Sequence, residues 1–210
     1  MVYFEKQKAA LCAVHTLNNL LQSQFFSEID LAELASVITQ KEHSLYLTTP
    51  SENHHVSLSG DFSTDVVQLA LQNLDLSMVH LNSEDPIVVQ IRSNPTSAEG
   101  FILNRNTEDI GHWLSLRKVQ GKWFELDSLA SQPREISPSL LELTVDQYFR
   151  QGYSVFVVYG NYPYVDPSEA VVVEGSDDDE YFEQDPNVLK AQEDADLAFA
   201  LALSRSMSDK

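Results

Sequence analysis

The chain has a single cysteine, Cys12, at the start of a segment with helical spacing, residues 11–22. On that helix Cys12 falls on the polar side with His15, away from the apolar stripe of Leu17 and Leu21. A lone thiol is more often a small buried hydrophobe than a catalytic group. However, a core cysteine is expected on the apolar stripe, and a helix N-terminus favours the nucleophilic thiolate. Cys12 is therefore a candidate nucleophile.

A nucleophilic thiol needs a base, and the base needs a group that orients it. Four of the six histidines are expected at the surface or in structural roles: His43, His54, His55 and His80. His15 lies one helical turn from Cys12 and stays open as an alternative base. His112 is favoured by its position in a predicted β-hairpin.

The hairpin spans residues 111–128, "GHWLSLRKVQGKWFELDS", with its turn at Gln120-Gly121. His112 and Asp127 fall near the far ends of its two strands, opposite or diagonal to each other depending on the register. A carboxylate beside an imidazole holds its tautomer and stabilises the imidazolium. Taken alone, the hairpin is better explained as a surface hairpin with an incidental histidine–aspartate pair. The argument for a catalytic role depends on the other candidate residues.

Gln7 precedes the candidate nucleophile by five residues. Attack on a carbonyl creates an oxyanion that needs fixed donors, and a glutamine amide with the backbone N–H of Cys12 would supply them. The order glutamine, cysteine, histidine and aspartate is typical of papain-like thiol hydrolases. This chemistry needs neither metal nor cofactor.

Helical patterns come first in the chain and strand patterns follow. Predicted helices are residues 11–22, 27–38, 62–74 and 137–152, the second opening with a capping-box pattern at Ser27 and Asp30 and the third capped by Ser63. Predicted strands are residues 77–82, 86–91, 100–104, 112–118, 122–127 and 153–160. This order predicts an α+β domain in which N-terminal helices pack on a mostly antiparallel sheet.

Composition divides the chain into a globular part, residues 1–165, an acidic linker, 166–190, and a C-terminal helix, 191–208. The net charge is −19, from 32 acidic against 13 basic residues, which argues against direct binding to nucleic acid or an anionic membrane. One cysteine excludes an internal disulfide and a cysteine-based zinc site, and indicates the nucleus or cytoplasm. We expect neither a signal peptide nor a membrane span.

The block "EKQKAALCAVHTLNNLLQSQFFSEIDLAELA" resembles the opening of the Josephin domain, the deubiquitinase domain of the Machado–Joseph disease protein (ataxin) family. "GHWLSLRKVQGKWFELDSL" and "QGYSVFVVYGNYP" resemble its later blocks, so the resemblance covers residues 3 to 165. It implies a papain-like cysteine protease fold. It also implies that Gln7, Cys12, His112 and Asp127 are oxyanion donor, nucleophile, base and orienting residue.

The resemblance further implies that Phe25 and Phe26 contact ubiquitin. Its ataxin branch has asparagine at the position of Asp127, whereas the smaller josephins have aspartate. The segment after the second helix is shorter than the helical hairpin that gates the cleft in the ataxin branch, which implies a difference in substrate selection.

The C-terminal "EDADLAFALALSRS" resembles a ubiquitin-interacting motif. Leu197, Ala200, Leu201 and Ser204 fall on one helical stripe around a small residue, which suits close approach to a flat apolar patch. The alternative is an amphipathic helix that packs back on the domain.

Val171, Val172 and Val173 precede a run of acids, the form of a SUMO-interacting strand. An apolar patch in a linker explains them equally well.

Two functional hypotheses remain. The first is a thiol isopeptidase that cleaves ubiquitin from lysine conjugates or chains and holds polyubiquitin through its tail helix. The second is a non-enzymatic ubiquitin-binding adaptor. An intact set of four site residues favours the first.

Overall fold

The computed structural model describes residues 2–7, 11–46, 55–56, 62–106, 111–165 and 172–173. The chain divides into two units, Met1–Gly175 and Ser176–Lys210, and all described residues belong to the first. Within the described residues, no helix combines the length and the apolar character needed to cross a membrane.

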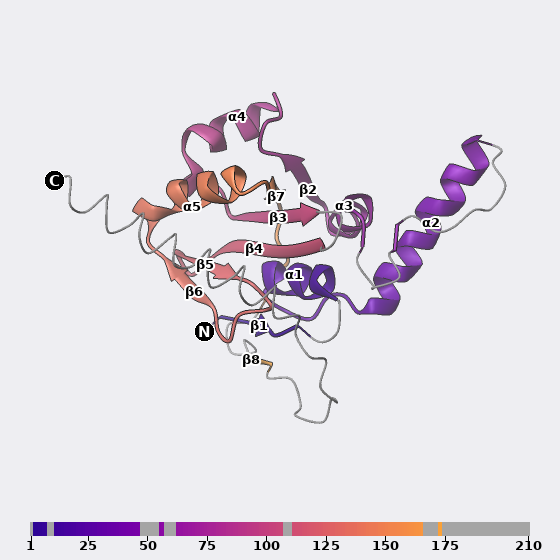
Figure 1. Ribbon diagram of the computed structural model, residues 1–210, viewed down its shortest axis with the longest axis horizontal. Coiled ribbons are helices and arrows are strands. Elements are labelled where there is room, and N and C mark those ends of the chain that lie inside the picture. Colours follow the sequence, from indigo (N-terminus) through magenta and orange to yellow (C-terminus); the bar gives the residue numbers. More distant parts are fainter. Residues whose placement is uncertain are drawn as a thin grey trace. The chain divides into compact units, whose positions relative to one another are not determined.

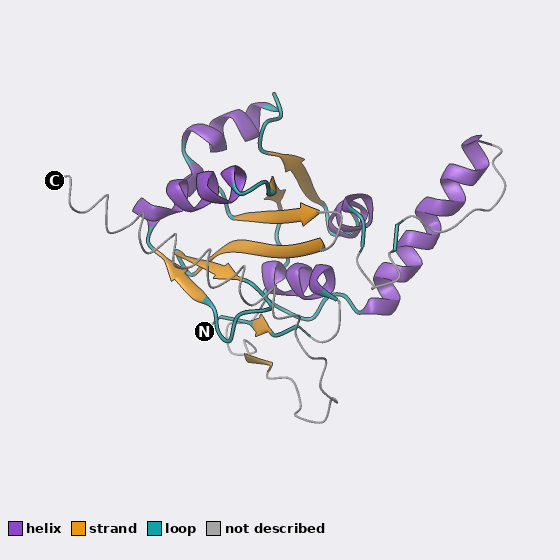
Figure 2. Ribbon diagram, viewed as in Figure 1, coloured by secondary structure: helices purple, strands orange, loops and turns teal. Residues whose placement is uncertain are grey.

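A six-stranded antiparallel sheet forms the centre of the first unit (Figure 2). Its strand order is β2-β7-β3-β4-β5-β6. The strands are β2 (Leu76–His80), β3 (Gly100–Asn106), β4 (Gly111–Val119), β5 (Lys122–Leu126), β6 (Arg134–Ile136) and β7 (Ser154–Gly160). The mixed helix and sheet content confirms the predicted α+β class and the mostly antiparallel sheet.

Helices cover both faces of the sheet (Figure 1). They are α1 (Cys12–Leu21), α2 (Glu28–Tyr46), α3 (Thr64–Gln72), α4 (Pro86–Ser93) and α5 (Pro138–Arg150), with a short 3₁₀ turn, η1 (Pro95–Ser97). Helices α1, α2 and α3 contribute to one buried apolar cluster, and α4 and α5 to a second. The nucleophile helix α1 therefore lies on a different face of the sheet from α4 and α5.

Helix α1 is buried on nearly all sides. Every residue of this helix except His15 is buried, including the polar Thr16, Asn18 and Asn19. The distinction between a polar side and an apolar stripe holds for residue type but not for exposure. Asn18 and Asn19 are satisfied in the interior by hydrogen bonds to Glu5 in the N-terminal segment, as described below, whereas the buried Thr16 hydroxyl has no hydrogen-bond partner among the described residues.

The caps predicted for two helices are confirmed. Asp30 Oδ2 accepts from the Ser27 N–H at 2.7 Å, and Ser27 Oγ accepts from the Asp30 N–H at 3.4 Å, which completes the reciprocal capping box of α2. Ser63 Oγ accepts from the Val66 N–H at 3.4 Å at the start of α3.

The strand predicted over residues 86–91 is wrong, because this segment forms α4. Asp85 caps it, accepting from the Ile87 N–H at 2.8 Å, and Pro86 occupies the first turn. Val88 and Ile91 are buried at helical spacing, whereas Ile87 is 46% exposed. The apolar run suggested a strand, but the capping aspartate and proline in front of it are helix-start signals.

A small second sheet was not predicted. Strand β1 (Phe4–Glu5) pairs in parallel with β8 (Val172–Val173), with Phe4 opposite Val172 and Glu5 opposite Val173. Part of the segment expected to be an acidic linker is therefore paired with the N-terminus, and the first unit runs to Gly175. Two residues of each strand take part, too few for the sequence to have signalled the pairing.

Candidate active site

The hairpin β4–β5 brings His112 and Asp127 together. Gln120 and Gly121 both have positive φ, 51° and 79°, as a two-residue type I′ turn requires. The ladder ends with Ser115 paired to Leu126, so continuing its register by one step would set Asp127 opposite Leu114. His112 is two residues from Leu114, so in this register His112 and Asp127 are diagonal neighbours at the end of the hairpin away from its turn.

The imidazole of His112 is held by that carboxylate. His112 Nε2 lies 3.0 Å from Asp127 Oδ1, and both side chains are largely buried. Asp127 Oδ1 also accepts from the Leu129 N–H at 3.0 Å, which fixes the carboxylate. With Nε2 engaged by Asp127, Nδ1 is the ring nitrogen left for a second partner.

The thiol of Cys12 is also hydrogen-bonded to the side chain of His112. Cys12 is buried at the first position of α1. Burial alone would lower the pKa of His112, but hydrogen bonds to Asp127 and Cys12 and the charges of both groups outweigh it and raise this pKa to about 10. The arrangement therefore favours a protonated imidazole at His112, beside the carboxyl of Asp127 and the thiol of Cys12.

Gln7 is anchored to the residue that follows Asp127. Its backbone N–H donates to the Ser128 carbonyl at 2.8 Å, and Ser128 Oγ donates to Gln7 Oε1 at 3.2 Å. Because Oε1 is held in this way, the orientation of the amide is set, with its NH₂ donors turned from Ser128. Ser128 is 1% exposed. The sequence analysis missed Ser128, whose only signal is its place directly after Asp127.

The alternative base, His15, is engaged elsewhere. Its Nδ1 lies 2.8 Å from Oε2 of the buried Glu5. This pairing favours His112 over His15 as the base. Glu5 was also missed, although an extended segment places residues 5 and 7 on one side.

Phe25 and Phe26 lie between α1 and α2. Both are partly buried and pack against the apolar cluster of the α1 face. Their backbone N–H groups donate to Asn18 Oδ1 at 3.0 and 2.9 Å. Their contact with ubiquitin stays a prediction.

The tail residues Leu197, Ala200, Leu201 and Ser204 lie outside the described residues, as does Val171. Val172 and Val173 are described, and their backbone is paired with β1. A partner such as SUMO would have to compete with that pairing or use the other edge of this strand.

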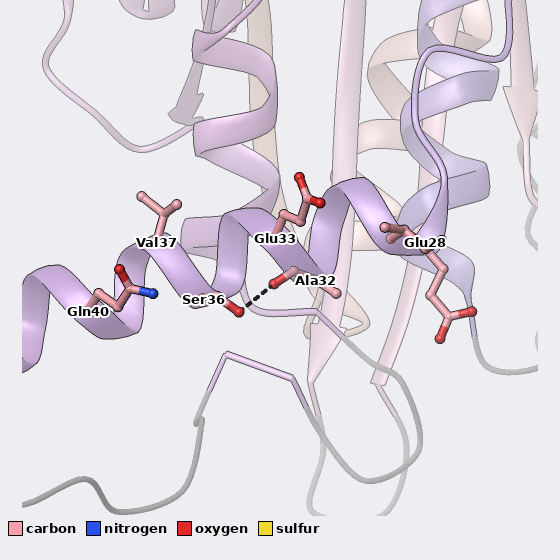
Figure 3. A pocket seen from close by; sticks show the side chains of 7 residues that line it. Glu28, Ala32, Glu33, Ser36, Val37 and Gln40 are labelled. Atoms are coloured by element: carbon pink, nitrogen blue, oxygen red, sulfur yellow. Dashed lines mark hydrogen bonds between the residues drawn. The ribbon is translucent and has the colours of Figure 1, made fainter.

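An open hollow of about 670 Å³ runs along one side of α2 (Figure 3). Its lining residues are Glu28, Ile29, Ala32, Glu33, Ser36, Val37 and Gln40. None of the candidate catalytic residues lines it. Among the described residues, no group of three or more histidine, cysteine, aspartate or glutamate side chains could hold a metal ion.

Comparisons with known proteins agree with the geometry. Residues 7–159 match the Josephin family. The chain is 38% identical to an ataxin-3 homologue of Arabidopsis thaliana over 78% of its own length and 60% of that protein. It is 32% identical to an ataxin-3 homologue of Caenorhabditis briggsae, over 97% of its own length and 69% of that protein.

Human ataxin-3 is 35% identical over 77% of this chain and 46% of its own length. The chain therefore spans about half to two thirds of the length of such relatives. The family match covers well over half of the chain and includes Gln7, Cys12, His112 and Asp127. On this evidence, the chain belongs to the Josephin family.

Proposed function

We propose that this protein is a cysteine deubiquitinase, a thiol isopeptidase that cleaves ubiquitin from lysine conjugates or from ubiquitin chains. The observation that carries the proposal is the buried line of Cys12, His112 and Asp127. Membership in the Josephin family supports the choice of ubiquitin as substrate.

In the proposed mechanism, the thiolate of Cys12 attacks the carbonyl that joins the C-terminal glycine of ubiquitin to a lysine amine. The oxyanion is stabilised by the Gln7 amide and the Cys12 backbone N–H. His112 donates its proton to the leaving amine, and a thioester with Cys12 remains. His112, again a base, activates a water molecule that hydrolyses the thioester. Asp127 keeps the imidazole oriented throughout.

The test is reaction with a ubiquitin bearing an electrophile at its C-terminus, followed by cleavage of ubiquitin chains. Wild-type protein should form a covalent adduct and cleave chains, and Cys12→Ala should do neither while keeping the same melting temperature to within a few degrees. An adduct formed by Cys12→Ala would show that another group is the nucleophile.

The competing function is a ubiquitin-binding adaptor without catalysis. It predicts that wild-type protein binds ubiquitin chains but neither reacts with the electrophile nor cleaves any chain. The buried carboxylate–imidazole–thiol arrangement argues against it, because an adaptor gains nothing from burying these polar groups.

We further propose that the tail helix over residues 191–208 holds ubiquitin chains through Leu197, Ala200, Leu201 and Ser204. In a full-length Cys12→Ala background, which prevents turnover, Ala200→Gly should weaken chain binding. It removes the central methyl and costs about 1 kcal/mol of helix propensity. Ser204→Ala should weaken it also, by losing a hydrogen bond worth about 0.5–1.5 kcal/mol. If Cys12→Ala and the two variants made in its background bind chains equally well, the tail helix does not hold ubiquitin through these residues.

SUMO binding through Val171, Val172 and Val173 and a nuclear and cytoplasmic location stay predictions. For SUMO, the measurement is a titration of wild-type protein against a variant with all three valines replaced by serine. Loss of binding in the variant is the expected result.

A further inference from the structure

Glu5 is a buried carboxylate that the proposed mechanism does not use. The residue is 7% exposed, and its carboxylate is bonded by three side chains. His15 Nδ1 lies 2.8 Å from Oε2, Asn18 Nδ2 donates to Oε1 at 3.3 Å and Oε2 at 3.2 Å, and the Tyr3 hydroxyl donates to Oε1. A buried charge with this many donors is held in one position.

The segment Tyr3–Gln7 runs along α1 in the opposite direction, fastened by a ladder of side chains. Gln22 makes two hydrogen bonds to the backbone of Tyr3. Its Oε1 accepts from the Tyr3 N–H at 3.0 Å, and its Nε2 donates to the Tyr3 carbonyl at 3.2 Å. Asn19 does the same for Glu5: its Oδ1 accepts from the Glu5 N–H at 2.7 Å, and its Nδ2 donates to the Glu5 carbonyl at 3.2 Å. Glu5 then reaches His15, one helical turn from Cys12.

This ladder predicts what lies opposite Gln7. An extended chain rises about 3.3 Å per residue, so four residues from Tyr3 to Gln7 span about 13 Å. A helix rises about 1.5 Å per residue, so the same span corresponds to about nine residues of α1. Counting nine residues back from Gln22, the partner of Tyr3, leads to Ala13, the neighbour of Cys12.

We propose that Glu5 is a positioning residue for the oxyanion site: its bond to His15 sets the register of Tyr3–Gln7 on α1 and so holds the Gln7 amide beside Cys12. Asn19 and Gln22 bond the backbone of the same segment further from the nucleophile. Ser128 holds Gln7 from the opposite side. Glu5 and Ser128 together fix both the position and the orientation of the amide. The inference rests on the proposed function, because it assigns Gln7 its oxyanion role.

If Glu5 had only a structural role, its loss would slow every reaction of Cys12. If Glu5 positions the oxyanion donor, its loss slows only the reactions in which an oxyanion forms. Alkylation of Cys12 by iodoacetamide needs the thiolate but creates no oxyanion. Turnover of a ubiquitin C-terminal amide needs both. The two rates, measured on the same full-length protein, therefore separate the two roles.

The experiment compares wild type, Glu5→Gln, Gln7→Ala and the double variant. Gln7→Ala should lower kcat by about 10²–10³-fold, the usual loss for one oxyanion donor. Glu5→Gln should lower kcat by about 10- to 100-fold, with KM and the alkylation rate within about twofold of wild type. The double variant should match Gln7→Ala, because Glu5 acts only through Gln7. Glu142→Gln, a change at an exposed glutamate of α5, is the matched control and should alter neither rate.

The inference would be overturned if the loss of kcat in the double variant equalled the product of the two single losses. It would also be overturned if the alkylation rate of Glu5→Gln fell together with its kcat. If Glu5→Gln does not fold, His15→Asn breaks the same contact from the helix side, and it must show the same separation of the two rates for the inference to hold. Failure of the proposed function is distinct: wild-type protein would be alkylated at Cys12 but would not turn over the ubiquitin substrate.

Discussion

His112 Nε2 and Asp127 Oδ1 lie 3.0 Å apart, with His112 on β4 and Asp127 directly after the last residue of β5. The two-residue turn at Gln120-Gly121 determines this relationship, because a turn longer by one residue would shift Asp127 to the other face. The distance between the candidate base and its orienting group thus depends on a turn that begins eight residues after His112 and ends six residues before Asp127.

Asp127→Asn should retain considerable activity. The asparagine amide oxygen can still accept from His112 Nε2, but the charge that stabilises the imidazolium is lost. We expect kcat for a ubiquitin C-terminal amide to fall by about tenfold, with Asp127→Ala losing more. A loss in Asp127→Asn as large as that in Cys12→Ala would contradict an orienting role.

His112→Ala should be more damaging than His15→Ala. Removing the general base and acid costs about 10²–10⁴-fold in kcat. His15→Ala removes one of the three side chains that bond the Glu5 carboxylate, so its loss should stay within about 100-fold. Steady-state kinetics on the two variants decide the assignment, and it is reversed if His15→Ala is the slower enzyme.

The pH dependence of stability should carry the signature of His112. Its pKa is raised from 6.5 to about 10, so the protonated imidazole contributes stability that is fully present below pH 6.5. That contribution is lost as the pH rises toward 10. Urea unfolding of wild type and His112→Gln should therefore show a difference in unfolding free energy that shrinks over this range. A constant difference would mean that His112 is neutral in the resting protein.

Glu5 should show the opposite dependence. Burial alone would raise the pKa of Glu5, but hydrogen bonds from His15, Tyr3 and Asn18 outweigh it and lower this pKa from 4.5. A depressed carboxylate contributes stability above its unfolded pKa and loses it as the pH falls through the folded value. Acid unfolding of wild type should thus be steeper than that of Glu5→Gln below pH 4.5. Parallel curves would show that the carboxylate is not ionised.

Helix α2 offers a matched pair for the core. Leu31 is fully buried, whereas Ile29, two residues earlier, is 70% exposed. Leu31→Ala should cost about 2–5 kcal/mol of unfolding free energy, because it opens a cavity in the apolar cluster that α1, α2 and α3 share. Ile29→Ala should stay within about 0.5 kcal/mol. Similar losses in both variants would place Ile29 in a buried contact.

Several elements were determined by the sequence alone. The hairpin with its Gln120-Gly121 turn, the capping box at Ser27 and Asp30, and the helix that begins at Cys12 follow from local chemistry within a few residues. Local signals of this kind depend on backbone preferences and near neighbours, so they are visible in a single sequence. Local signals failed for the segment Pro86–Ser93, which was predicted as a strand from its apolar run although Asp85 is a helix cap.

The sequence indicated the candidate site by residue type but not by contact. Sequence order indicated Gln7, Cys12, His112 and Asp127, yet it could not choose between an opposite and a diagonal placement of the last two. The strand register made that choice, by pairing Ser115 with Leu126.

Only the tertiary structure placed Glu5 against His15, Ser128 against Gln7, and Val172–Val173 beside β1. The residues in these contacts are 10 to 168 positions apart in the sequence, and Gln7 and Ser128 are 121 positions apart. A single sequence carries no local signal for such pairs, because their stability comes from burying polar groups that find partners only after the chain has packed.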